Sequence, residues 1–155
     1  MEPVTSVADP RVQVLARHHD VATYLDDAHE AAWQAVDPVL LELCRLRVAM
    51  LLRNPAALSL RTPEAVAAGL GEAKIAQLRN WPTSTLYDER DRACLAFCEQ
   101  FVIDVANLTD EQGAAVSVHL GPQGLADFVS ALLTIEQRQR LSLAWPLLLD
   151  LEEVA

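Results

Sequence analysis

A glutamate and an arginine frame the stretch of this sequence whose residue types could do chemistry. Glu42 lies in an apolar segment, and Arg61 follows it after a turn at Asn54-Pro55. A carboxyl group and a guanidinium that share one pocket are suited to binding a carboxylate or enolising a carbonyl compound. The pattern therefore predicts a candidate site with Glu42 as acid or base, Arg61 as carboxylate anchor and Asn54 beside them.

Glu42 has two other interpretations. Burial would raise the pKa of its carboxyl group unless a cation lies near, and either Arg45 or Arg61 could supply that cation. In that case the ion pair is structural and sets the register of the helix. Alternatively, Glu42 is exposed to solvent and forms no stabilising ion pair.

Three charged residues near the C-terminal end extend the candidate site. Glu136, Arg138 and Arg140 lie on the last predicted helix. Glu136 and Arg138 are further candidates for substrate binding if this helix lines the same cavity. The alternative is a charge network that is solvated or lies between subunits.

Thiol and metal chemistry have little support in the sequence. Cys94 and Cys98 are four residues apart in a helical segment, where a disulfide would be strained, and Cys44 lies in an apolar run. We interpret all three as buried small hydrophobic residues. No two of the four histidines have the spacing of metal ligands. We therefore predict no metal and no other cofactor.

Composition excludes several classes of partner. The chain has 155 residues, enough for one domain with a proper core, and a formal charge of −10. Such an acidic chain cannot neutralise nucleic-acid phosphates or an anionic membrane surface. No apolar run reaches the roughly 20 residues that cross a bilayer. With no signal-peptide pattern and an odd number of cysteines, we expect a cytoplasmic protein.

Helical periodicity dominates the first half of the chain. Residues 1–10 are aperiodic and predict a flexible or docking arm, and residues 11–35 are helical with a break near His19-Asp20. The next helix, 38–53, is apolar on nearly all sides and belongs in the centre of a bundle or at a subunit interface. Residues 55–68 form either one bent helix or two short ones, ended by Gly69.

Further helices are predicted along the rest of the chain, and each boundary rests on a capping residue or a proline. We expect them at residues 72–78 and 88–104, then from a turn and cap at residues 107–111 through His119. After a break at Gly121-Pro122, the last helix covers residues 124–145 and ends at Pro146. The composition, which is 52% hydrophobic with only five glycines, favours packed helices over a sheet.

With these helices in place, the sequence resembles the carboxymuconolactone decarboxylase family, which includes the alkylhydroperoxidase D-like proteins. The resemblance covers residues 17–145 and is carried by three stretches, LELCRLRVA from Leu41, TPEAVAAGL from Thr62 and LYDERDRACLAFCE from Leu86. It implies an all-α, single-domain bundle of the alkylhydroperoxidase D-like type over residues 11–155, with about six to eight helices.

The redox members of that family carry a C-x-x-C pair at the start of the helix after the turn, with a glutamate before it and a histidine after it. A helix N-terminus lowers the pKa of a thiol, so that the thiolate can attack a peroxide or disulfide. In this sequence Glu42 matches the glutamate, whereas Asn54 and Ala57 stand at the cysteine positions and Arg61 at the histidine position. The resemblance therefore implies a degenerate active site without thiol peroxidase chemistry.

The family's common I-N-x-x-N-R motif is also altered, reading IEQRQR from Ile135 to Arg140. Three functions remain open. The chain is a non-redox oligomeric subunit, with a cysteine-bearing relative as a candidate partner, or a small-molecule-binding protein. Alternatively, it is a cysteine-independent decarboxylase, isomerase or cyclase that uses Glu42 and Arg61 on a small carboxylate or lactone. Family members commonly form dimers, trimers or hexamers, so we expect a homo-oligomer.

Overall fold

The computed structural model describes residues 19–153, and the side chains of residues 19–145. Every regular element in this part of the chain is a helix, which confirms the all-α prediction. The arm predicted at residues 1–10 and the start of the helix predicted over 11–35 lie outside the described residues.

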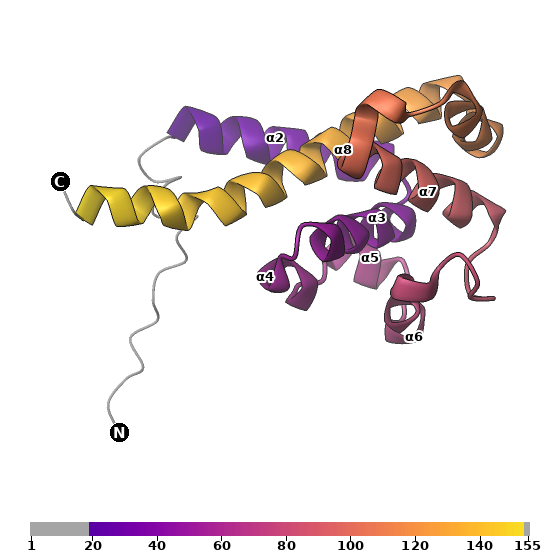
Figure 1. Ribbon diagram of the computed structural model, residues 1–155, viewed down its shortest axis with the longest axis horizontal. Coiled ribbons are helices and arrows are strands. Elements are labelled where there is room, and N and C mark those ends of the chain that lie inside the picture. The colour runs from indigo at the N-terminus through magenta and orange to yellow at the C-terminus, as the bar shows by residue number, and fades with distance from the viewer. Residues whose placement is uncertain (1–18, 154–155) are drawn as a thin grey trace.

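The helices follow the order expected from the sequence, with small changes at their ends (Figure 1). They are α2 (His19–Ala35), α3 (Pro38–Leu51), α4 (Pro55–Ser59), α5 (Pro63–Ala67), α6 (Glu72–Ala76), η1 (Leu78–Asn80), α7 (Glu89–Asp104), η2 (Val105–Asn107) and α8 (Asp110–Glu153). Residues 55–68 thus form two short helices, because the chain is extended at Leu60, between them. Gly69, with φ of 90°, ends the second as predicted.

Three helices begin after a capping residue followed by proline, at Asp37-Pro38, Asn54-Pro55 and Thr62-Pro63, and the side chain caps the helix at the first two. An Asp37 carboxylate oxygen accepts a hydrogen bond from the Leu40 N–H at 2.9 Å, and the Asn54 side-chain oxygen accepts one from the Ala57 N–H at 3.2 Å. Thr62 makes no side-chain cap. Its hydroxyl donates instead to a carboxylate oxygen of Glu42 at 2.8 Å, so a tertiary contact has replaced the local one.

Helix α3 is the centre of the bundle, as its apolar surface predicts. It packs against α7 and α8, and α4 and α5 fold back onto it (Figure 1). Its fully buried residues include Leu40, Leu41, Leu43, Leu46 and Val48. The core continues into α7 and α8, where the rings of Phe97 and Phe128 lie 5.9 Å apart.

Helix α8 differs from the prediction at its C-terminal end. It contains the expected break at Gly121, which has φ of 77° and ψ of 169°, but it continues past Pro146 to Glu153. The prediction that Pro146 ends the helix is wrong, because a proline removes one hydrogen bond of a helix without forbidding helical φ. Helix α8 packs against α2, and its C-terminal end extends past the rest of the bundle (Figure 1).

Candidate ligand-binding cavity

A cavity of about 410 Å³ opens where α2 and α8 meet the short helices that follow α3. Pockets of this size hold small organic molecules. Much of its wall is apolar and includes two tryptophans: Leu25 and Trp33 from α2, Ile135 and Trp145 from α8, and Ala57 and Leu60 from α4 and the residue after it. Its polar wall comes from His29, Arg45, Arg61, Thr62, Arg138, Gln139 and Ser142.

Glu42 lies behind this wall and is fully buried. Arg45 donates to both of its carboxylate oxygens, each at 2.7 Å. The hydroxyl and N–H of Thr62 donate to the same two oxygens at 2.8 and 3.3 Å. Burial would raise the pKa of Glu42, but the hydrogen bonds and charge of Arg45, together with the Thr62 hydrogen bonds, lower it overall. These contacts are those of an ionised structural residue, and Glu42 does not line the cavity.

Of the two cations considered for Glu42, Arg45 is the partner. Besides the carboxylate, Arg45 donates to the carbonyl oxygens of Ala57 and Leu60, both at 2.9 Å. Its guanidinium therefore fixes α4 and the turn after it onto α3. Together, Glu42, Arg45 and Thr62 hold one wall of the cavity in place.

Arg61 lines the cavity and forms a different ion pair. Its Nε lies 2.9 Å from a carboxylate oxygen of Glu72, whose side chain is 73% exposed. Its Nη1 donates to the carbonyl oxygens of Leu58 and Leu60, both at 2.7 Å. The hydrogen bond from Arg61 lowers the pKa of Glu72. Its Nη2 donates to the other carboxylate oxygen of Glu72 at 3.1 Å. Because solvent screens this exposed carboxylate, part of the positive charge of Arg61 remains to attract an anion in the cavity.

Arg138 brings a second guanidinium to the cavity, from α8. Its Nη1 donates to the carbonyl oxygen of Leu25 at 2.7 Å and lies 3.5 Å from a carboxylate oxygen of Asp26. The Asp26 side chain is 72% exposed, so its charge is also largely screened. Besides Arg45, whose charge is matched by buried Glu42, two guanidiniums thus reach one largely apolar cavity in a chain whose formal charge is −10.

The remaining two predicted binding residues are not on the cavity wall. Asn54 is 3% exposed and, besides capping α4, donates to the hydroxyl of Ser142 at 3.1 Å. It therefore supports a residue that lines the cavity. Glu136 pairs along α8 with Arg140 at 2.8 Å. Of the candidate binding residues, the structure brings only Arg61 and Arg138 together at the cavity.

Two further polar residues of the cavity escaped the sequence analysis. His29 was considered only as a metal ligand, although it lies one helical turn from both Leu25 and Trp33, which line the same cavity. Gln139 is 6% exposed and donates from Nε2 to the carbonyl oxygen of Arg45 at 2.8 Å. Nothing in the local sequence around Gln139 identifies this contact.

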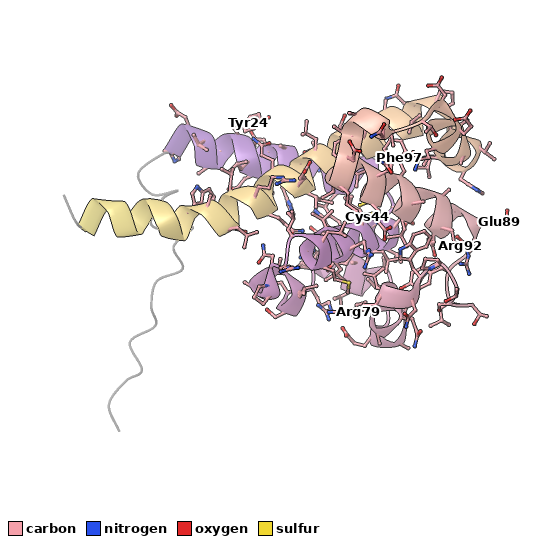
Figure 2. All side chains as sticks on the ribbon, in the orientation of Figure 1. Tyr24, Cys44, Arg79, Glu89, Arg92 and Phe97 are labelled. Carbon is pink, nitrogen blue, oxygen red and sulfur yellow. The ribbon has the colours of Figure 1, made fainter. Side chains whose placement is uncertain are left out.

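The cavity wall contains no thiol. The three cysteines are free and buried in α3 and α7, as predicted, and Figure 2 shows Cys44 within the bundle. The contact with Cys98 and burial raise the pKa of Cys44, and burial raises that of Cys94 to about 12. The thiols of Cys44 and Cys94 are therefore protonated at neutral pH and are poor nucleophiles.

Among the described residues, no group of three or more histidine, cysteine, aspartate or glutamate side chains is placed to hold a metal ion. A membrane-spanning helix is likewise not found in the described part of the chain.

Comparison with known proteins identifies the family. The model of the carboxymuconolactone decarboxylase family matches residues 19–100, which run from the start of α2 into α7 and make up more than half of the chain. Searches of curated proteins and of solved structures found no match. The match includes α3, which carries Glu42, and α4, which carries Ala57 and is capped by Asn54. The chain belongs to the carboxymuconolactone decarboxylase family.

Proposed function

We propose that this protein binds a small organic anion with an apolar body, and that it does so without thiol peroxidase chemistry. The observation that carries the proposal is the cavity of about 410 Å³ that combines apolar walls with the guanidiniums of Arg61 and Arg138. A carboxylate accepts paired hydrogen bonds from a guanidinium, and apolar walls favour a hydrocarbon body.

The contacts of Glu42 favour binding over an acid–base reaction at that residue. A general base must lie within hydrogen-bond reach of the proton that it removes. Glu42 is fully buried, and each of its carboxylate oxygens already accepts two hydrogen bonds. A decarboxylase, isomerase or cyclase that depends on Glu42 would have to break this network before each turnover.

The experiment is a thermal-unfolding screen against small carboxylates, with benzoate as the first probe. A ligand that binds only the folded protein at 100 times its Kd stabilises it by about 2.7 kcal/mol. We expect benzoate to raise Tm in the wild type, and Arg61→Gln and Arg138→Gln to reduce that rise. Arg79→Gln is the control, because Arg79 is exposed and does not line the cavity.

Two outcomes would contradict the proposal. The first is that no small carboxylate raises Tm while native mass spectrometry of protein purified from its host finds no retained small molecule. The second is that benzoate raises Tm by the same amount in Arg61→Gln, Arg138→Gln and Arg79→Gln.

We also propose that the protein assembles as a homo-oligomer, with α2 in the interface. Val21 and Tyr24 lie one turn apart on α2 and are 47% and 60% exposed, and Figure 2 shows Tyr24 on its outer side. Neighbouring apolar side chains of this size at a surface indicate a protein contact. Light scattering after size-exclusion chromatography should give a multiple of 17.0 kDa, and Tyr24→Lys should lower it. A wild-type monomer at micromolar concentration would refute this second proposal.

A further inference from the structure

We propose that the ligand of this cavity is a carboxylic acid that also carries a hydroxyl group, and that His29 accepts a hydrogen bond from that hydroxyl. This inference rests on the proposed function, since it adds a second recognised group to the anion that Arg61 and Arg138 attract.

The position of His29 places its ring at the cavity. Leu25, His29 and Trp33 follow one another at intervals of four residues along α2, and all three line the cavity. The His29 ring is tilted by 47° against that of Trp33, with 5.8 Å between their centres. Within the described part of the chain, His29 makes no hydrogen bond or ion pair. Its two ring nitrogens are therefore available to a ligand.

The surroundings of His29 favour the neutral imidazole. Burial is the largest influence and lowers its pKa, and the positive charges of Arg138 and, more weakly, Arg45 act in the same direction. Glu64 and Asp26 oppose them but do not outweigh them. Since a free histidine titrates near pH 6.5, His29 is neutral at pH 7. A neutral imidazole has one nitrogen that donates and one that accepts a hydrogen bond.

Gln139 adds a second acceptor to the same wall. Its Nε2 is held by the carbonyl oxygen of Arg45, which fixes the orientation of the amide. Its Oε1 is buried and has no hydrogen-bond partner among the described residues. A buried acceptor without a partner is destabilising, so a shift of this side chain that exposed Oε1 to a donor in the cavity would be favourable.

The polar groups of the cavity thus divide into two kinds. Arg61 and Arg138 supply positively charged donors, which match a carboxylate. His29 and Gln139 supply acceptors that lack a partner in the described structure, which match a hydroxyl group on the same ligand. Trp33 and Trp145 provide apolar surface for the body between these two groups. A simple carboxylate would leave the acceptors unpaired.

The test compares benzoate with the three monohydroxybenzoates by isothermal titration calorimetry at about pH 7.5, where His29 is neutral. We expect at least one monohydroxybenzoate to bind about tenfold more tightly than benzoate, the effect of one good hydrogen bond. In His29→Leu this preference should fall to within about twofold.

His119→Leu is the matched control, because His119 is exposed and does not line the cavity. It should keep the full preference for the hydroxylated acid. If all four acids bind the wild type equally, or if the preference survives in His29→Leu, the inference about the hydroxyl is wrong and the proposed anion site stands. If neither benzoate nor any hydroxybenzoate binds the wild type, the proposed anion site fails and this inference fails with it.

Discussion

Replacing Glu42 by glutamine separates a structural role of this carboxylate from a catalytic one. The substitution keeps the shape of the side chain but removes the charge that faces Arg45, whose side chain is only 11% exposed. It also weakens the two hydrogen bonds from Thr62. Removing one partner of a buried ion pair typically destabilises a protein by 3–5 kcal/mol, and because the amide oxygen can still accept hydrogen bonds we expect about 3 kcal/mol.

Urea unfolding followed by circular dichroism measures this loss. With a slope of about 2 kcal/mol per molar urea, a loss of about 3 kcal/mol lowers the midpoint by about 1.5 M. Glu89→Gln is the control, because Glu89 is exposed and Figure 2 shows it at the outer end of α7. It should lose less than about 1 kcal/mol, since only its interaction with the helix dipole changes.

The pH dependence of stability provides an independent check. The pKa of Glu42 in the folded protein lies below its ordinary value of 4.5, so its contribution is present above pH 4.5. That contribution should disappear as the pH falls from 4.5 through the lowered folded-state pKa. The stability difference between wild type and Glu42→Gln should therefore shrink in the same range. A difference below about 1 kcal/mol at pH 7, or one that does not change with acid, would refute the structural role.

Three further predictions concern other parts of the described structure. Arg92 donates to four backbone carbonyl oxygens in the segment 81–87. Arg92→Ala should therefore destabilise the protein by about 2–3 kcal/mol and accelerate hydrogen exchange in this segment. Unchanged exchange in the segment would contradict this role of Arg92. The three buried cysteines should react with a thiol reagent at pH 8 only after unfolding, and rapid reaction of the native protein would disprove that the fold covers them. Protonation of His29 removes its acceptor, so the preference for a hydroxybenzoate over benzoate should decline in calorimetry as the pH falls from 6.5 through the lowered pKa of His29. A preference that stays constant down to the pH at which the protein unfolds would show that His29 does not accept the hydroxyl.

The helices and the central place of α3 could be predicted from the sequence because their causes are local. Asp37 and Asn54 cap the helices that begin beside them, and the following prolines are compatible with a first helical turn. The nearly uniform apolar surface of α3 can be satisfied only by neighbours on all sides. The prediction at Pro146 was wrong because a proline disfavours a helix locally without excluding it, so the local signal did not decide where α8 ends.

The partner of Glu42 was only partly accessible from the sequence. Arg45 lies three residues away on the same helix, which is a local signal for an ion pair. That signal alone did not exclude Arg61. Arg45 is the partner of Glu42 because α4 folds back onto α3 and presents the carbonyl oxygens of Ala57 and Leu60 to the Arg45 guanidinium. Arg61 pairs with Glu72 instead.

By itself, the sequence determined an all-α bundle, buried thiols and the absence of a C-x-x-C pair at the turn before α4. These follow from periodicity, capping and residue identity, which act within a few neighbouring positions. Only the tertiary structure decided that His29 of α2, Arg61 beside α4 and Arg138 of α8 line one cavity. These residues come together because α2 and α8 pack against each other, although more than 100 residues separate their contacts in the sequence. No local pattern specifies a contact between residues so far apart in the chain.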